Sequence, residues 1–256
     1  MKKIIRFGVL LILMTALVSC NKIAFDDDGV LEFYPTGNGY VVSIKDKEYA
    51  KYMEEIEIPY FYKFKPVVGI GEKAFSGCSN LKQITIPSSV ETIGDYAFEG
   101  CRGLTSITVP EGVTSIGEAA FADCKGLASV RLADSVTSIG EAAFAGCESL
   151  TGITIPGSVT EISNDAFEYC TGLMEVTIEC GITRIGDYAF HNCENLTSVT
   201  IPDSVTIIGD HAFAYCYRMQ NINYCGTEAE WESITKGNRW NRFVSSCTIT
   251  YNYDGE

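Results

Sequence analysis

Reactive side chains in this 256-residue sequence are mostly thiols, because it contains eleven cysteines and only two histidines. Seven of the cysteines recur at an interval of 23 residues: Cys78, Cys101, Cys124, Cys147, Cys170, Cys193 and Cys216. In an extracellular chain, so many cysteines usually indicate a disulfide framework. Side chains stacked one repeat apart point in the same direction, however, and their Cβ atoms do not converge as a disulfide requires. We therefore expect buried free thiols that pack as small apolar groups. Of the other four cysteines, Cys20 lies near the N-terminus, and the oxidation state of Cys180, Cys225 and Cys247 is left open.

The two histidines, His191 and His211, are 20 residues apart and would lie on adjacent turns of a 23-residue repeat. Three acidic residues lie near them in the sequence: Asp187, Glu194 and Asp210. A zinc site could be assembled from such ligands. His211, however, occupies the repeat position of Tyr96 and Tyr188, which favours stacking of aromatic rings along the surface. No nucleophile–base–acid set, Gly-rich phosphate loop or C-x-x-C motif is visible, so we predict a non-enzymatic protein without a metal or cofactor.

The elements that carry these residues come from a 23-residue unit written seven times without insertion or deletion. Self-similarity at a fixed period of this size is typical of solenoids. In each unit the pattern L-x-x-I-x-I, as in Leu104–Val109, alternates apolar residues with polar ones and predicts a short strand with one buried face. Proline ends four of these strands, at Pro87, Pro110, Pro156 and Pro202. Stacked strands would form one parallel sheet with about 4.8 Å between turns.

The other half of the unit has the pattern I-G-[DE]-x-A-F. We expect its glycine to permit a sharp turn, with Ser163 as the one departure from the glycine column. The acid that follows, such as Asp95, would cap free N–H groups at the start of a short helical turn, and a metal or substrate role is the disfavoured alternative. The Ala, Phe, Cys, Leu and Ile columns would fill the interior. The fold class is therefore predicted to be an α/β-type repeat solenoid with one short parallel strand per turn.

The ends of the solenoid are predicted to be sealed by sequence that leaves the pattern. Residues 20–66 would form an N-terminal linker and cap with a hairpin turn at Thr36–Gly39 and a first strand near Glu57–Pro59. The seven repeats would occupy residues 67–225.

The C-terminal cap is predicted over residues 226–256. Ile222–Tyr224 would form a last strand of the repeat, and Thr248–Tyr251 a closing strand. Trp231 falls in phase with the isoleucine column that includes Ile208. We therefore expect it to plug the core and not to bind a ligand.

Residues 1–19 have the composition of a signal peptide, in which basic residues precede a twelve-residue apolar run, Phe7–Val18. This run is too short to span a bilayer. It ends in L-V-S-C, Leu17–Cys20, which resembles a bacterial lipobox. The resemblance implies cleavage before Cys20, lipid attachment to that residue and durable anchoring in a membrane. An ordinary secretory signal with a chance cysteine is the alternative.

The formal net charge of −14 argues against nucleic acid as a partner, because phosphate binding needs clustered positive charge that this chain lacks. For the same reason, contact with the membrane is expected through the lipid anchor only. A hydrophobic content of 46% is ample for a core. We expect one elongated, monomeric domain.

The unit A-F-x-x-C-x-x-L-x-x-[IV]-x-I-P-x-S-V-T-x-I-G, at Ala189–Gly209, resembles the BspA-type leucine-rich repeat. The segments Phe25–Leu31 and Cys225–Trp231 are similar to the end modules that accompany this repeat, so the resemblance covers about residues 25 to 251. It implies a leucine-rich-repeat right-handed superhelix. It also implies a surface lipoprotein of the Bacteroides group, exposed at the outer membrane.

By this resemblance we expect a lipid-anchored cell-surface protein that mediates protein–protein interaction or adhesion. Its partner would be a surface protein of a host or a neighbouring cell. The alternative function is a carbohydrate-binding surface lipoprotein for glycan capture. In that case aromatic residues of the N-terminal cap would grip the ligand: Tyr60, Phe61, Tyr62 and Phe64.

Candidate ligand contacts are the exposed strand positions that depart most from the repeat: Lys82, Gln83, Arg131, Met174 and Glu175. In most other repeats these columns hold Thr, Ser, Ala or Gly. Threonine is itself favoured at exposed strand positions, so the regular part of the surface carries little information. Drift on a tolerant surface is the alternative to a binding role.

Overall fold

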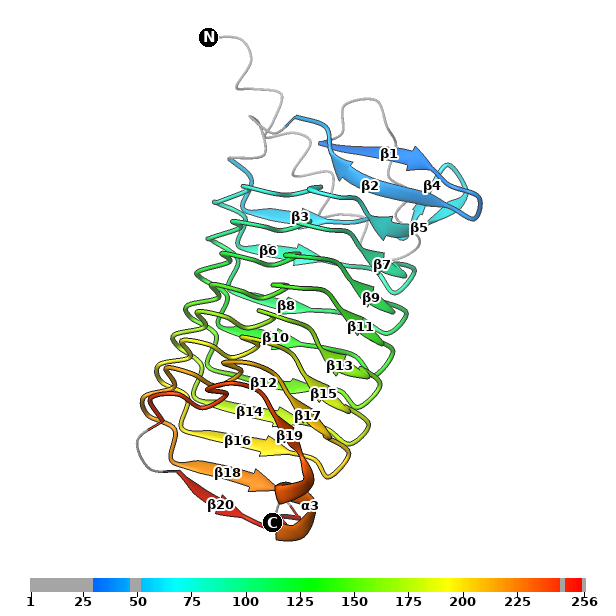
Figure 1. Cartoon of the computed structure of the whole chain (residues 1–256). Helices are drawn as coiled ribbons and strands as arrows, with labels where there is room; N and C mark the ends of the chain where they lie inside the picture. The colour runs from blue at the N-terminus through cyan, green and yellow to red at the C-terminus, as the bar shows by residue number, and fades with distance from the viewer. Residues whose placement is uncertain (1–29, 47–51, 245–246, 255–256) are drawn as a thin grey trace.

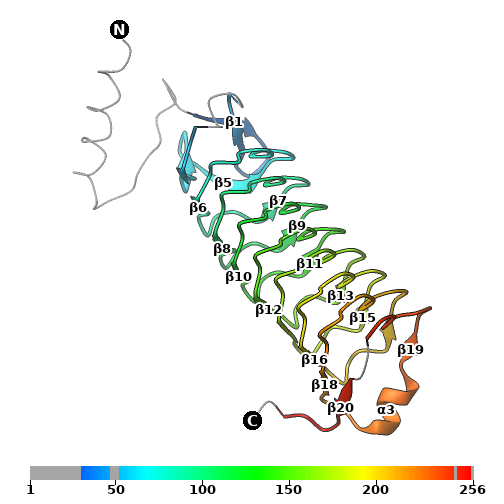
Figure 2. The same ribbon diagram turned by 90° about the vertical axis from the view of Figure 1, so that its left-hand side faces the viewer.

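The computed structural model describes residues 30–46, 52–244 and 247–254. Over these ranges the chain winds into an elongated stack of turns, with a hairpin at one end and a short helix near the other (Figure 1). Figure 2 shows the turns following one another in a single direction between these two ends. Successive strands pair with partners 23 residues away, as Gly152 does with Glu175. The predicted solenoid of 23-residue turns is therefore confirmed.

The N-terminal end is covered by a hairpin of β1 (Leu31–Pro35) and β2 (Tyr40–Ile44). The Thr36 N–H donates to the Gly39 carbonyl at 2.8 Å, which confirms the hairpin turn predicted at this place. Strand β2 then pairs in parallel with β5 (Lys65–Ile70), and the short β4 (Phe61–Tyr62) folds back on β5. The hairpin thus continues the stack and covers its first turn.

A first series of strands runs along the solenoid and contains the strands predicted from the L-x-x-I-x-I pattern (Figure 1). Its members are β3 (Glu55–Glu57), β6 (Gln83–Thr85), β8 (Ser106–Thr108), β10 (Ser129–Arg131), β12 (Gly152–Ile155), β14 (Glu175–Ile178), β16 (Ser198–Ile201), β18 (Asn221–Tyr224) and β20 (Thr248–Thr250). The predicted last strand and closing strand are β18 and β20. Pairing is parallel from β12 to β20, from β8 to β10 and from β3 to β6, so the single parallel sheet that was predicted is divided into three. We call the outward side of these strands the strand face.

A second series of two-residue strands lies beside the first (Figure 1), which corrects the expectation of one strand per turn. Its members are β7 (Thr92–Ile93), β9 (Ser115–Ile116), β11 (Ser138–Ile139), β13 (Glu161–Ile162), β15 (Arg184–Ile185), β17 (Ile207–Ile208) and β19 (Thr235–Lys236). Strands β2, β5, β7, β9 and β11 form one continuous sheet, and β13 to β19 form another.

The short helical turn expected after each of these strands is absent from the described repeats, and tight turns replace it. The residue two positions after each column glycine has a φ of 49° to 57°, including Tyr96 and Ala142, and this conformation cannot continue a right-handed helix. The backbone donors are used between turns instead. The Tyr96 N–H donates to the Glu118 carbonyl and the Phe98 N–H to the Ala120 carbonyl, both at 2.7 Å.

The glycine column serves close packing between turns and not an unusual backbone angle. A Cβ atom at Gly117 would lie 2.6 Å from the backbone nitrogen of Asp95, far closer than a carbon atom can approach. The acid after this glycine caps an N–H group as predicted, but the N–H belongs to the next turn. Asp95 accepts a hydrogen bond from the Glu118 N–H at 2.9 Å.

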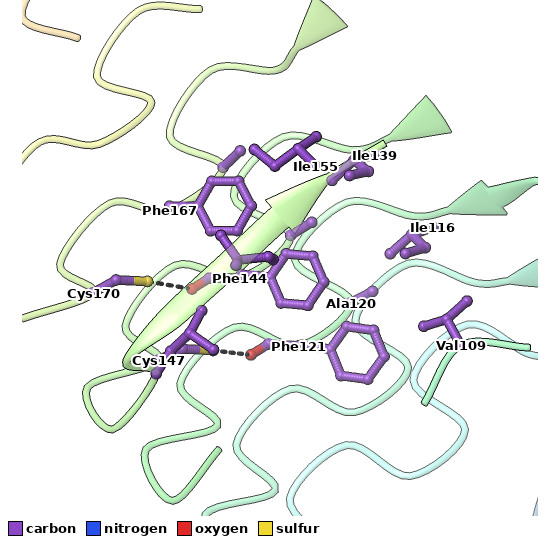
Figure 3. Packing of buried hydrophobic residues seen from close by; sticks show 14 of the residues in the cluster. Val109, Ile116, Ala120, Phe121, Ile139, Phe144, Cys147, Ile155, Phe167 and Cys170 are labelled. Atoms are coloured by element: carbon purple, nitrogen blue, oxygen red, sulfur yellow. Dashed lines mark hydrogen bonds between the residues drawn. The ribbon is translucent and has the colours of Figure 1, made fainter. Parts of the chain in front are cut away.

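The core between the sheets and the turns is a set of stacked identical side chains. Seven phenylalanine rings stack with centroids 5.0–5.4 Å apart, and Figure 3 shows three of them in a row. The six ladder thiols from Cys101 to Cys216 are buried, and each donates to a phenylalanine carbonyl of the preceding turn at 3.1–3.3 Å. These cysteines therefore act as predicted, as small core residues, and also join neighbouring turns.

The C-terminal end contains a helix that was not predicted, α3 (Glu228–Ser233). It begins with a capping box in which the Thr227 hydroxyl and the Glu230 carboxylate each bond to the other's backbone N–H, and T-x-x-E in the sequence was the available signal. Trp231 is buried as expected, and its ring centroid lies 5.2 Å from that of Tyr224. Its predicted phase is wrong, because the helix lengthens this turn and places Lys236 opposite Ile208. In the described ranges, no helix has the length and apolar character needed to cross a membrane.

Candidate functional site

The predicted contact residues lie at three places along the strand face. Lys82, just before β6, is exposed and forms an ion pair with Glu54 at 2.9 Å, and Gln83 is the exposed first residue of β6. Met174 is half exposed and directly precedes β14. Arg131 ends β10 and Glu175 begins β14, and both are exposed. The five residues therefore do not form one cluster.

Arg131 and Glu175 line the same hollow, which has a volume of about 390 Å³ and spreads over β10, β12 and β14. We call it the strand-face hollow. Gly152 lies in it, at the column where β10 carries Ser129 and β14 carries Glu175. Because glycine has no side chain, the surface is lower there than over the neighbouring strands.

The hollow combines charged walls with an apolar floor. Besides Arg131, its charged groups are three carboxylates: Asp134, Glu175 and Glu179. Val130 and Leu132 also line it and are only partly buried, whereas the corresponding residues of other turns, such as Val176, are fully buried. A volume of this size is at the lower end of the range for ligand sites, about 300–1,000 Å³.

Sequence reasoning missed Gly152, Asp134 and Glu179. Glu179 had a signal, because it stands in the column where Pro87, Pro110, Pro156 and Pro202 end their strands. Its carboxylate accepts a hydrogen bond from the Gly157 N–H at 3.1 Å, so it is held against the neighbouring turn. Asp134 had no signal, since its column varies from repeat to repeat.

The two histidines lie in an aromatic cluster on the side of the turns. Tyr188 and His211 stack with centroids 5.0 Å apart, which confirms the predicted aromatic stacking. His191 Nδ1 lies 3.0 Å from a Glu168 carboxylate oxygen. Burial, and secondarily His211, lowers the pKa of His191, while burial raises the pKa of Glu168. Among the residues with described positions, no group of three potential metal ligands is found.

The aromatic residues proposed for glycan capture do not all face solvent. Tyr62 is buried and stacks on Phe33 with centroids 4.1 Å apart, so it belongs to the core of the cap and cannot contact a ligand. Alternation along β4 places Phe61 outward, with 40% of its surface exposed. Tyr60 is similarly exposed at 45%, and Phe64 is exposed at 89%.

Comparison with known proteins agrees with this architecture. The family description "BspA type Leucine rich repeat region" matches residues 43–174 and 118–235. A leucine-rich repeat protein of T. pallidum has a similar structure, with a TM-score of 0.61, 26% identity, and coverage of 84% of this chain and 86% of that one. A leucine-rich repeat protein from Bacteroides ovatus has a TM-score of 0.50 and 25% identity, over 90% of this chain and 71% of that one.

A third similar structure, a leucine-rich repeat protein from Eubacterium ventriosum, has a TM-score of 0.51 and 26% identity over 82% of this chain and 49% of that one. No curated protein matches the sequence. The family match extends from the end of the N-terminal hairpin through α3 and so includes every repeat that the structure describes. From the repeat, its packing and this match, the chain belongs to the BspA-type leucine-rich-repeat family.

Proposed function

We propose that this chain is a non-enzymatic surface lipoprotein whose strand face binds a protein partner. The observation that carries the proposal is the strand-face hollow, where Arg131 and Glu175 flank an apolar floor on an otherwise regular surface. Charged groups around an apolar centre are a common arrangement at protein interfaces. A repeat scaffold with an extended outer face suits such a role better than it suits catalysis.

Anchoring at the cell surface is the second part of the proposal and rests on the lipobox-like segment. Cys20 lies outside the described residues, so its support is the sequence alone. A lipid-anchored solenoid of the outer membrane could present its strand face to a host or neighbouring-cell protein. Adhesion is the function that these two features would serve together.

The binding surface is tested by capture of partners from surface-protein extracts with the full chain. The double variant Arg131→Ala with Glu175→Ala is expected to lose the captured protein, and binding to the unaltered chain should weaken as salt is raised. The matched control is Lys125→Ala with Glu148→Ala, which removes one cation and one anion of an exposed ion pair outside the hollow. Equal capture by both double variants would refute a partner site at the hollow.

Glycan capture remains a second candidate because of the cap between β4 and β5. Lys63 and Phe64 hold positive φ angles in the tight loop there, and the Phe64 ring projects into solvent. Binding on a glycan array that is lost on Phe61→Ala with Phe64→Ala would favour this candidate. Unchanged glycan binding by that variant would remove the cap from consideration.

A further inference from the structure

Both strand series of the solenoid are interrupted at the same junction, between the third and fourth repeats. Strand β10 pairs with β8 and β12 pairs with β14, with no pairing between β10 and β12. In the second series, β11 pairs with β9 and β13 with β15, again with no pairing across. The first sheet is also interrupted between β6 and β8, but there the second remains continuous through β7 and β9. We call the double interruption the seam.

Ser163 explains the break in the second series, because it replaces glycine in the close-packed column. A Cβ atom at the equivalent Gly140 would lie 2.5 Å from the Glu118 nitrogen, and one at Gly186 would lie 2.7 Å from the Asn164 nitrogen. The serine Cβ must therefore hold its turn away from the preceding one.

The hydrogen bonds at this position change accordingly. The Gly140 N–H donates to the Ile116 carbonyl and the Gly186 N–H to the Ile162 carbonyl, both at 2.8 Å. At Ser163 the hydroxyl donates to the Ile139 carbonyl instead, at 2.6 Å. In the preceding turn, the Thr137 N–H donates to the Thr114 carbonyl at 2.9 Å. The equivalent bond, from the Thr160 N–H to the Thr137 carbonyl, is absent between these two described residues. The serine side chain thus occupies the place where the backbones would otherwise meet.

On the side away from the strands, the tight turns of the same two repeats remain hydrogen-bonded to each other. The Phe144 N–H donates to the Ala166 carbonyl at 2.9 Å, and the Cys170 thiol donates to the Phe144 carbonyl at 3.2 Å (Figure 3). On the sheet side, the Thr151 N–H donates to the Ala128 carbonyl at 3.5 Å and the Ser158 hydroxyl donates to the Val136 carbonyl at 2.6 Å. The separation is therefore confined to the strand positions themselves. The strand-face hollow lies over the seam, and a second hollow of about 230 Å³, lined by Ser163, lies over it in the second series.

The charges and the apolar floor of the strand-face hollow indicate which kind of side chain it would bind. Arg131, Asp134 and Glu175 form no ion pair with any residue that the structure describes, so their charges are available to a ligand. Three carboxylates against one guanidinium leave the hollow with a net negative charge. The floor at Val130 and Leu132 is apolar. A side chain with an aliphatic stem and a cationic head matches both features, since the stem can cover the floor while the head meets the carboxylates.

We propose that the seam is a preformed receptor for one lysine or arginine side chain of an extended protein segment lying along the strand face. Arg131 would then pair with an acidic residue of the same segment. This inference deepens the proposed function and rests on it, because it supplies the chemistry of the protein partner.

The test uses the full chain and three blocked pentapeptides, Thr-Val-X-Val-Thr, in which X is lysine, norleucine or glutamate. Binding is followed by the amide shifts of β10, β12 and β14 in an NMR titration. The lysine peptide should bind saturably there and about tenfold more tightly than the norleucine peptide, which has the same stem without the charge. The glutamate peptide should not bind. Equal binding of the lysine and norleucine peptides would overturn the assigned chemistry.

Two variants of one residue separate the shape of the hollow from its charges. Ser163→Gly should let the turns close, protect the Thr160 amide from hydrogen exchange and weaken the lysine peptide about tenfold, although every charged group remains. Ser163→Ala keeps the Cβ atom and should retain both the open seam and the binding. Glu175→Gln with Glu179→Gln should weaken binding with the seam still open.

The outcomes distinguish this inference from the proposed function. If Ser163→Gly fails to protect Thr160, or protects it and leaves peptide binding unchanged, the seam is not the receptor. Capture of a surface protein that is lost on Arg131→Ala with Glu175→Ala but kept in Ser163→Gly would also overturn the seam while preserving the proposed function. Selective lysine-peptide binding without any captured surface protein would leave the seam standing and contradict the proposed function.

Discussion

At the residue scale, the tight turns place side chains where the backbone favours glycine. Seven equivalent positions, two residues after each column glycine or Ser163, have φ angles of 49° to 57°: Lys73, Tyr96, Ala119, Ala142, Asp165, Tyr188 and His211. A left-handed conformation costs an L-residue about 1–2 kcal/mol. The left-handed conformation is retained in every repeat because it directs backbone N–H groups toward the next turn, where they donate hydrogen bonds to backbone carbonyls.

Ala142→Gly is therefore expected to raise the free energy of unfolding by about 0.5–1 kcal/mol, after allowance for the greater freedom of glycine in the unfolded chain. The neighbouring Ala143 is fully buried and is not among the positive-φ residues, so it provides a matched control. Ala143→Gly should lower the free energy of unfolding by about 1–2 kcal/mol, through loss of a buried methyl group and added chain entropy. Denaturant titration measures both changes. A loss of stability in Ala142→Gly as large as that in Ala143→Gly would contradict the role assigned to the φ angle.

The ladder thiols give a pH-dependent prediction. Burial raises the pKa of the Cys216 thiol to about 12 and raises that of Cys193 as well. An unfolded thiol has a pKa of about 8.5, so the native state holds these protons more tightly. Their contribution to stability is fully present below about pH 8.5 and is lost as pH rises toward the native pKa.

The free energy of unfolding should accordingly fall between pH 8.5 and pH 10, as measured by urea titration. At neutral pH a thiol reagent should label the exposed Cys180 much faster than the buried ladder, which should react only after unfolding. Labelling of Cys147 at the rate of Cys180 in the native protein would show that the ladder is accessible.

At the scale of the elements, the spacing of the turns depends on a column of glycines and on the one serine that interrupts it. The prediction concerns Gly117, where a Cβ atom would lie 2.6 Å from a backbone nitrogen of the preceding turn, and Gly152, where the nearest atom is 3.5 Å away. Gly117→Ala should lower the free energy of unfolding by more than about 2 kcal/mol, because the backbones must separate. Gly152→Ala should change it by less than about 0.5 kcal/mol. Equal effects of the two substitutions would mean that close approach does not set the turn spacing.

Much of the repeat could be predicted at this scale because each buried column meets a copy of itself one turn away. The first-sheet strands, the Phe and Cys columns and the hairpin follow from periodicity and local turn chemistry. The second strand series could not be found in the same way. Its two-residue strands and the turns after them are held by hydrogen bonds between repeats, and the sequence of one repeat resembles a short helix start.

The candidate site was predictable only in part, for related reasons. Arg131 and Glu175 stand out because they replace small polar residues in exposed columns. Ser163 was visible as the exception in the glycine column, but its consequence depends on the 2.5–2.7 Å approach of neighbouring backbones, which requires the stacked structure. The half-buried Ser163 lines the hollow over the second series, and the exposed Arg131 and Glu175 line the strand-face hollow, so the seam relates three departures that lie far apart in the sequence.

At the scale of the whole molecule, the solenoid offers a long strand face whose most distinctive point lies between the third and fourth repeats. Presentation of that face at the cell surface is a separate proposal that depends on Cys20. We expect the unaltered chain to enter the membrane fraction with a lipid mass on Cys20, and Cys20→Ala to be released to the soluble fraction. Cell fractionation with intact-mass measurement checks this. An unmodified Cys20 at the mature N-terminus would refute lipid anchoring.

The central claim is that the strand-face hollow is the contact site for a protein partner. Titration of the captured partner against two double variants, each lacking one cation and one anion, tests it most directly. Arg131→Ala with Glu175→Ala should weaken binding about tenfold or more, and Lys125→Ala with Glu148→Ala should leave it within about twofold. Binding by the first variant as tight as that of the unaltered chain, with the protein folded, would contradict the account.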